Sequence, residues 1–257
     1  MGVTLKSEQE IASMRKANQV VAQVLRELEQ LVAPGVTTEQ LDKRAEELTK
    51  ELGAEAAFLN YPSGSTSVPP FSGHICASVN DAVVHGLPSK RPLVEGDIIS
   101  IDYGAKVDGF YGDSAITVAV GEVAPQVKKL ISVTEQALYA GIEKCVAGNR
   151  IGDVSYAIQS LVEKNGFGIV KDFVGHGIGT KMHEDPQVPN YGKPNKGKKL
   201  EVGLVIAIEP MVSQGKPAVK LLEDGWTAVL ADGTYAAHIE HTVAVTSRGP
   251  EILSSRK

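Results

Sequence analysis

The chain is poor in the residues that mark several large protein classes. Only two cysteines occur among its 257 residues, Cys76 and Cys145, and they form no CxxC pair. This excludes a disulfide framework and a thiolate zinc site, and it fits a reducing compartment. No apolar run approaches the length of a membrane span, and the opening "MGVTLKSEQE" lacks the apolar core of a signal peptide. We therefore expect a cytoplasmic protein with no membrane partner.

Positive charge is also scarce. The formal net charge is −5, which gives no support to a nucleic-acid-binding surface. One basic run, "KPNKGKK" at 193–199, could touch ribosomal RNA in a transient contact, although such a run is more often a solvated loop. The hydrophobic content of 42% is that of an ordinary globular protein with a real core.

Two helices are predicted in the first 53 residues. "SEQE" at 7–10 has the spacing of a capping box, and Gly53 ends a second helical stretch that begins near "TTEQ". Apolar residues recur at helical intervals in both stretches: Ile11, Met14, Ala17, Val21, Val24 and Leu28, then Leu41, Ala45, Leu48 and Leu52. Each helix therefore buries one face.

A similar pair of helical stretches returns about 114 residues later, at 127–148 and 151–166. An internal duplication is favoured over a chance match of apolar stripes, and both interpretations stay open at this point. A duplication predicts one pseudo-twofold domain over 1–257, with halves of about 1–120 and 121–257 and a site between them. Strand-like segments at 97–104, 110–120, 203–210 and 238–246 make the fold α+β.

Two aspartates interrupt the predicted hairpin "IDYGAKVDGFYGD" at 101–113. If the turn is centred between Val107 and Asp108, then Asp102 and Asp113 lie directly opposite each other, with their Cβ atoms roughly 5 Å apart. Carboxylates so close repel each other unless they share a proton or a cation. The alternative is that both aspartates simply cap turns.

Other segments favour the shared cation. Glu209 ends the apolar strand "VIAIEPM", and Glu240 lies in the alternating strand "HIEHTVAV". Buried acidic residues of this kind usually have a partner or a metal. His176 lies in the glycine-rich "VGHGIG", where the backbone can pass close to a ligand, and His183 follows seven residues later.

These segments, in this order, resemble the motifs of methionine aminopeptidases, a family of the pita-bread metallopeptidase superfamily. "NDAVVHG" belongs to the same match, which extends over about residues 5–248. The resemblance implies a pita-bread fold, that is, a pseudo-twofold domain with an antiparallel sheet flanked by two helix pairs. It also implies removal of the initiator methionine from nascent proteins with a small second residue, by attack of a metal-bridging water on the first peptide bond. We expect a monomer.

The resemblance assigns roles to individual residues. Two divalent metal ions are implied, with these ligands: Asp102, Asp113, His176, Glu209 and Glu240. In the family the second aspartate and the last glutamate bridge both ions. Glu209 is also the implied proton shuttle, His183 the residue that stabilises the oxyanion, and His85 the contact to the nitrogen of the cleaved bond. Such a mostly oxygen ligand set suits Mn²⁺, Fe²⁺, Co²⁺ or Zn²⁺.

Alignment with the family also implies a methionine pocket. Its residues are Phe71, Cys76, His85, Met182 and Trp226, next to His183. The segment "NYPSGSTSVPPFSG" at 60–73 differs in length from many relatives, and Met182 stands where bacterial forms often have an aromatic residue.

The remaining histidines are read as structural. Strand alternation turns His241 away from the face of Glu240. His238 shares that face but has no motif behind it, and His74 lies in a turn.

The bacterial type I class is favoured because only 25 residues separate His183 from Glu209, too few for the helical insertion of type II enzymes. A proline-specific peptidase such as aminopeptidase P or prolidase is one alternative, and those enzymes usually carry a further N-terminal domain. An inactive relative that binds peptides or ribosomes is the other. Such relatives lose metal ligands, whereas all five are present here.

Overall fold

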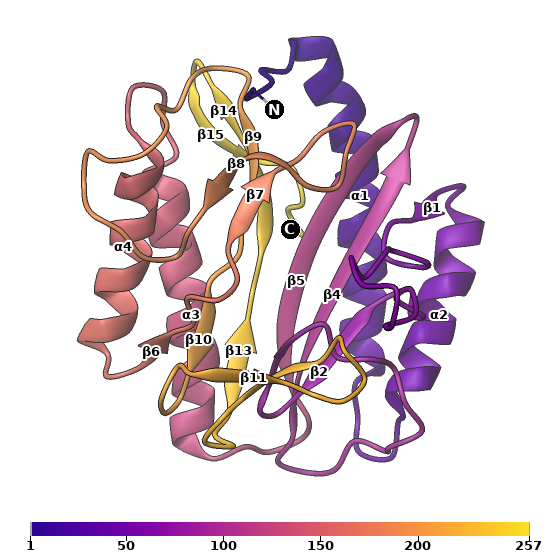
Figure 1. Ribbon diagram of the computed structural model, residues 1–257. Coiled ribbons are helices and arrows are strands. Elements are labelled where there is room, and N and C mark those ends of the chain that lie inside the picture. Colours follow the sequence, from indigo (N-terminus) through magenta and orange to yellow (C-terminus); the bar gives the residue numbers. More distant parts are fainter. Residues whose placement is uncertain (1, 257) are drawn as a thin grey trace.

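The computed structural model describes residues 2–256, which contain four α-helices and fifteen β-strands (Figure 1). The helices are α1 (Glu8–Leu31), α2 (Thr38–Glu51), α3 (Pro125–Glu143) and α4 (Ile151–Lys164). The strands of the first half are β1 (Glu55–Ala56), β2 (Cys76–Val79), β3 (Ala82–Val84), β4 (Ile98–Val107) and β5 (Phe110–Ala119). Those of the second half are β6 (Gly168–Ile169), β7 (Gly175–Gly177), β8 (Glu184–Val188), β9 (Val205–Ile208), β10 (Met211–Ser213), β11 (Val219–Leu221), β12 (Ala228–Leu230), β13 (Ala236–His238), β14 (His241–Thr246) and β15 (Gly249–Ile252).

The starts of α1 and α2 confirm the capping signals. At α1, the Glu10 amide donates to Ser7 Oγ over 3.3 Å, and the Ser7 amide donates to the Glu10 carboxylate over 2.7 Å. Thr37 and Gln40 make the same reciprocal pair at α2. These bonds satisfy amides that have no partner inside a helix, so the sequence fixes where both helices begin.

The two helix pairs flank the strands on opposite sides, with α1 and α2 on one side and α3 and α4 on the other (Figure 1). Gly112 on β5 lies so close to α1 that a Cβ atom there would meet the backbone of Ala17 and Asn18. The apolar stripes form separate cores, one from α1, α2 and β4 and another from α3, α4, β9 and β14. This confirms the predicted α+β architecture. The division into halves at about residue 120 stays a prediction.

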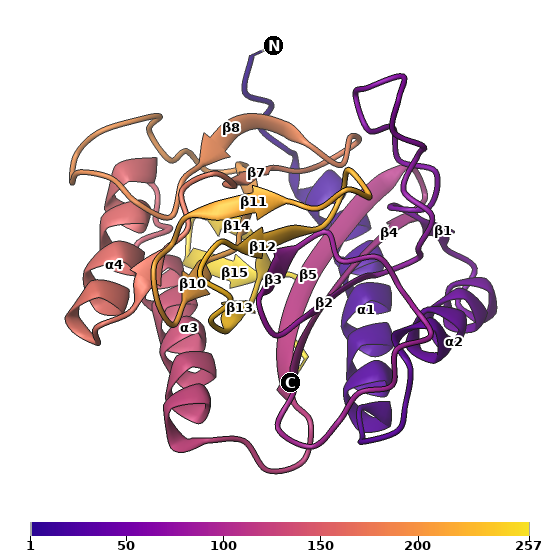
Figure 2. The ribbon, with the colours of Figure 1, turned by 60° about the horizontal axis from the view of Figure 1, so that its bottom comes forward.

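The strands divide among four antiparallel sheets. One has the order β1-β4-β2, with β5 paired to β4, and the largest has the order β15-β14-β9-β7-β8. Two smaller sheets are β13-β10-β6 and β11-β12-β3, the second of which lies between the helix pairs in Figure 2. Hairpin β4–β5 carries Asp102 and Asp113, and Glu209 and Glu240 lie next to strands β9 and β14 of the five-stranded sheet.

The register of hairpin β4–β5 differs from the prediction by two residues. Asp102 pairs with Ala115 and Asp113 with Gly104, so the two aspartates are not directly opposed. The reason is the turn: Asp108 and Gly109 both have positive φ values, 50° and 84°, which form the two-residue Asp-Gly connection typical of tight hairpins. A shift by two keeps side chains on the same face, so Asp102 and Asp113 become diagonal neighbours.

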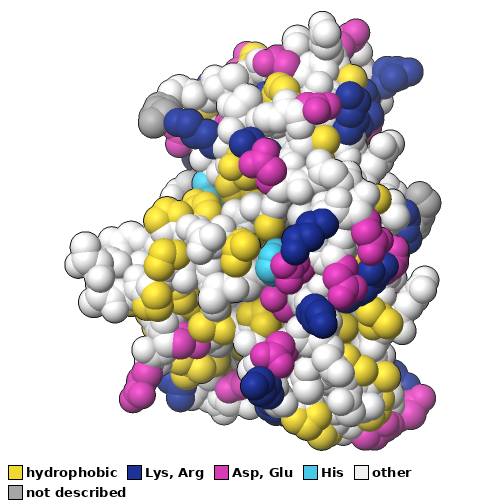
Figure 3. All heavy atoms as spheres, turned by 90° about the vertical axis from the view of Figure 1, so that its right-hand side faces the viewer, with side chains coloured by type: hydrophobic (Ala, Val, Ile, Leu, Met, Phe, Trp, Pro, Cys, Tyr) yellow, Lys and Arg dark blue, Asp and Glu magenta, His cyan; other side chains and the backbone are white. Residues whose placement is uncertain are grey.

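The surface carries charges of both signs. On the face in Figure 3, Lys and Arg side chains lie among Asp and Glu side chains without a large patch of one sign. The lysines of loop 193–199 are exposed, as expected for a solvated loop. Within residues 2–256, no helix has both the length and the apolar character that crossing a membrane requires.

Candidate metal centre

One cavity gathers every residue that the sequence marked for metal binding, catalysis or substrate binding. It has a volume of about 180 Å³, room for one side chain rather than a large ligand. Its lining consists of Phe58, Tyr61, Phe71, Cys76, His85, Asp102, Asp113, His176, Met182, His183, Glu209, Trp226 and Glu240. Phe58 and Tyr61 are the two lining residues that the sequence analysis missed.

Hydrogen bonds tie Asp113 on β5 to Glu240, which lies between β13 and β14. Ser114 Oγ donates to the Glu240 carbonyl over 2.6 Å, and the Glu240 amide donates to the Ala115 carbonyl over 3.0 Å. In return, Thr242 Oγ1 donates to the Asp113 carbonyl over 2.8 Å. Backbone from distant parts of the chain therefore holds these two carboxylates side by side.

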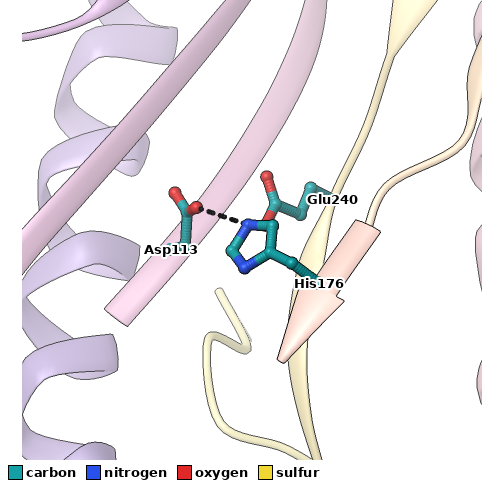
Figure 4. Close-up of side chains that lie close together, drawn as sticks. All are labelled: Asp113, His176 and Glu240. Atoms are coloured by element: carbon teal, nitrogen blue, oxygen red, sulfur yellow. Dashed lines mark ion pairs between the residues drawn. The ribbon is translucent and has the colours of Figure 1, made fainter. Parts of the chain in front are cut away.

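His176 on β7 completes one side of the cluster (Figure 4). Its Nε2 lies 3.7 Å from Asp113 Oδ2 and 3.7 Å from Glu209 Oε1. Its Nδ1 lies 2.9 Å from the Gly177 carbonyl, which can only accept, so Nδ1 carries a proton. A neutral ring then presents a bare Nε2 to the cluster, as a metal ligand must.

The glycines around His176 allow this close packing. A Cβ atom on Gly175 would collide with the Ala207 carbonyl, and one on Gly177 with the backbone of Asp185. Both glycines therefore let β7 fit between β8 and β9. Glu209 directly follows β9, and its carbonyl accepts a 2.9 Å hydrogen bond from the fully buried Asn190 side chain.

The buried carboxyl groups raise one another's pKa values. Burial, followed by the charges of Asp113 and Glu209, raises the pKa of Asp102 well above its usual range. Burial and the same two neighbours do so for Glu240, and burial raises the pKa of Asp113. Burial alone would lower the pKa of His176, but the nearby carboxylates of Asp113 and Glu209 raise it.

Several polar atoms in the cluster are buried and have no hydrogen-bond partner within residues 2–256: Asp102 Oδ1, Asp113 Oδ1, His238 Nε2 and Glu240 Oε1. Leaving such atoms unsatisfied is costly, and a cation would satisfy the oxygens. Among residues 2–256, ligand atoms of Asp113, His176 and Glu240 lie within 4.8 Å of one another, as do those of Glu209, His238 and Glu240. The donor set thus fits divalent cations.

His238, for which the sequence predicts a structural role, lies beside the cluster. Its side chain is 2% exposed, and its Nε2 lies 3.4 Å from Glu209 Oε2. The expectation that it shares the face of Glu240 was right. Its proximity to Glu209 follows from the pairing of β13 with β10, in which His238 faces Met211, and no sequence motif signals that pairing.

The other four histidines divide between the cavity and its surroundings. His74 Nδ1 is 3.3 Å from Asp42, and His241 Nδ1 is 2.9 Å from Ser254 Oγ, both outside the cavity. His85 and His183 line the cavity. Burial lowers the pKa of both, and burial together with the nearby His176 lowers that of His183 to about 4. Both rings are therefore neutral at physiological pH.

The raised carboxyl pKa values predict that divalent cations stabilise the protein more at higher pH. In the metal-free protein, the raised pKa values of Asp102 and Glu240 stabilise the folded state at low pH. This stabilisation is lost as the pH rises above the ordinary carboxyl range, because the buried groups must then ionise or stay protonated at a cost. Cations compensate the ionised carboxylates, so the rise in Tm on adding Mn²⁺ should be larger at about pH 7.5 than at about pH 5. Thermal scans with Mn²⁺ or a chelator test this, and a shift independent of pH would contradict it.

Comparisons with known proteins agree with this geometry. Residues 12–247 match the model of metallopeptidase family M24. A methionine aminopeptidase of Clostridium acetobutylicum is 49% identical, over 98% of each chain. The crystal structure of methionine aminopeptidase from Thermotoga maritima superposes with a TM-score of 0.95 at 44% identity, covering 99% of this chain and 100% of that one. A prolidase from Pyrococcus furiosus, 21% identical with a TM-score of 0.78, shares the fold over 98% of this chain and 65% of its own.

Proposed function

Because the chain belongs to metallopeptidase family M24, and because its cavity joins a carboxylate cluster to an apolar lining, we infer that it is a metal-dependent aminopeptidase that removes N-terminal methionine. The observation that carries this conclusion is that one cavity joins the carboxylate cluster to the apolar lining. Similarity to methionine aminopeptidases along the whole chain supports the choice of methionine. The fold is the pita-bread fold of this family.

Two divalent cations are the cofactor that we propose. Asp102 would hold one ion, His176 and Glu209 the other, and Asp113 and Glu240 would contact both. The unpartnered oxygens of Asp102, Asp113 and Glu240 support this assignment, because cations would satisfy them. Four carboxylates and one imidazole suit Mn²⁺, Fe²⁺, Co²⁺ or Zn²⁺.

The chain's own residues would move the protons and bind the peptide. When bound, such ions lower the pKa of a coordinated water and polarise the scissile carbonyl. Glu209 takes the proton of the attacking water and delivers it to the leaving amine. His183 donates a hydrogen bond to the oxyanion, and His85 contacts the peptide nitrogen. Both imidazoles are neutral, so each has one N–H to offer.

The apolar part of the cavity would select the first side chain. Phe71 and Trp226 pack edge to face with ring centroids 5.2 Å apart, and Met182 is 5% exposed. Cys76 pairs with Asp102 in adjacent strands, so the apolar lining begins directly beside the carboxylates. A peptide with its free amine at the ions therefore places its first side chain in the pocket, which favours unbranched methionine.

The substrates would be N-termini of nascent peptides, acted on in the cytoplasm by a monomer. The second residue of the substrate would be Gly, Ala, Ser, Thr, Cys, Pro or Val, because a larger side chain would clash where the peptide leaves the site. A transient ribosome contact through the exposed lysines of loop 193–199 extends the proposal.

The two alternatives have less support. Likeness to prolidase is limited to the fold, since sequence identity is 21%. An inactive binding module would have no need for five metal-ligand side chains around one cavity, yet all five are present.

The decisive experiment compares four tripeptides with enzyme reloaded with Mn²⁺, Co²⁺ or Fe²⁺. We expect rapid release of the first amino acid from Met-Ala-Ser alone, because Met-Leu-Ser has a large second residue and Leu-Ala-Ser and Ala-Pro-Ser lack methionine. Chromatography of the released amino acid measures this. Preference for Ala-Pro-Ser would indicate a proline-specific peptidase, and no turnover with any metal would indicate a binding module.

A further inference from the structure

Tyr61 contacts His183 at the edge of the cavity. The Tyr61 hydroxyl lies 2.7 Å from His183 Nδ1, and the two rings meet edge to face with centroids 5.5 Å apart. His183 is also packed against His176, with ring centroids 4.3 Å apart. Tyr61 thus hydrogen-bonds Nδ1 of His183, which leaves Nε2 for the proposed oxyanion contact.

The backbone holds Tyr61 firmly in this position. The Tyr61 amide donates to the Phe58 carbonyl over 2.9 Å, and the Tyr61 carbonyl accepts from the Phe71 amide over 2.9 Å. The second bond closes the base of loop 62–70. Trp226 Nε1 anchors the C-terminal end of this loop by donating to the Pro69 carbonyl over 2.9 Å. These hydrogen bonds therefore fix the position of the Tyr61 hydroxyl, as is required of a group that orients another side chain.

The direction of the hydrogen bond decides what His183 can do. A phenol is a good donor but a weak acceptor, because its oxygen lone pairs are partly delocalised into the ring. Tyr61 is therefore expected to donate and His183 Nδ1 to accept. A neutral imidazole has a single proton, so Nε2 must then carry it.

We propose that Tyr61 is a positioning residue that fixes His183 as the Nε2–H tautomer and so orients the hydrogen-bond donor of the reaction. This rests on the proposed function of His183. The neighbouring His176 has the opposite arrangement, because its Nδ1 donates to the Gly177 carbonyl and its Nε2 faces the carboxylates of Asp113 and Glu209. Two adjacent histidines would thus be assigned to different tasks by one partner each: His176 to bind a cation, His183 to donate a hydrogen bond.

Tyr61→Phe removes the hydroxyl and keeps the ring in the pocket wall. We expect kcat to fall by roughly tenfold, the effect of losing one neutral hydrogen bond, with little change in KM and two metal-binding steps retained. Tyr111→Phe is the matched control, because Tyr111 packs in the same apolar cluster and has no contact with His183 among those described. Its kcat should stay at the wild-type value.

Two further readouts separate positioning from a general structural role. In enzyme with nitrogen-15 histidine and diamagnetic Zn²⁺, NMR should show His183 as the Nε2–H tautomer, with Nδ1–H gaining population in Tyr61→Phe. His183→Ala identifies the signal. In addition, Tyr61→Phe should cost nothing further in the His183→Ala background, because it acts through that ring.

The possible outcomes are distinct. An Nδ1–H tautomer in the wild-type protein, or a full additional loss in the double variant, would overturn the proposal. A normal kcat in His183→Ala would instead refute the oxyanion role, while the NMR tautomer would still decide whether Tyr61 orients the ring.

Discussion

Replacement of Asp113 by alanine is expected to abolish the binding of two divalent cations, and peptide hydrolysis with it. The Asp113 side chain is 3% exposed and lies beside His176 and Glu240, which is where a carboxylate that serves both proposed ions would lie. Removing a residue that only hydrogen-bonds a metal ligand typically weakens metal binding by roughly 10–100-fold. Loss of the Asp113 carboxylate itself should weaken it further. Activity should fall by roughly 10³-fold or more, because the ions supply several kcal/mol to the transition state. Glu240→Ala should show the same loss of metal binding and activity.

Calorimetric titration with Mn²⁺, together with elemental analysis of the loaded protein, measures this result. Asp97→Asn is a suitable control. Asp97 is also a buried aspartate, 4% exposed, but it accepts hydrogen bonds from Asn80, Val94 and Arg91 outside the cavity. It should retain two binding steps even if its Tm falls. Two unchanged steps in Asp113→Ala and in Glu240→Ala would refute the ligand assignment.

His183→Ala is expected to lower kcat by roughly 10²–10³-fold, the loss typical of one oxyanion donor. Metal binding should persist, because His183 is not among the proposed ligands. The expected defect therefore lies in the chemical step, and steady-state kinetics with Met-Ala-Ser on enzyme of verified metal content measures it.

Two comparison variants test whether the loss of kcat comes from the missing hydrogen-bond donor. His183→Gln offers an amide donor in a similar place and should recover part of the activity. His74→Ala removes a histidine that pairs with Asp42 outside the cavity, and it should leave kcat unchanged. A metal-loaded His183→Ala enzyme with normal kcat would show that the ring is only structural.

The sequence was most informative where local chemistry alone determines structure. Capping pairs such as Ser7 with Glu10 set the helix starts, because the partners lie one turn apart. The acidic strands were recognised because a carboxylate in an apolar run is costly wherever the strand lies. The register of hairpin β4–β5 is also determined locally, since Asp108-Gly109 is the signal of a tight turn centred between these two residues.

Tyr61 and His238 could not be predicted in the same way. The position of Tyr61 depends on loop 62–70, which has no periodicity and is held by contacts to Phe71 and Trp226. The position of His238 depends on the pairing of β13 with β10, a choice that tertiary packing makes. In both cases the contacting residues are remote in sequence, and a single sequence does not show that they meet.

The hydrogen bonds between β5 and the segment around Glu240 have a consequence for folding. Ser114 and Glu240 are 126 positions apart, and Thr242 and Asp113 are 129 apart, so these contacts form only when distant parts of the chain have docked. A cation held at Asp113 and Glu240 would close the same long loop and act as a reversible cross-link. Metal uptake would therefore report completion of the tertiary structure, and chelation would shorten the lifetime of the native state under protease attack.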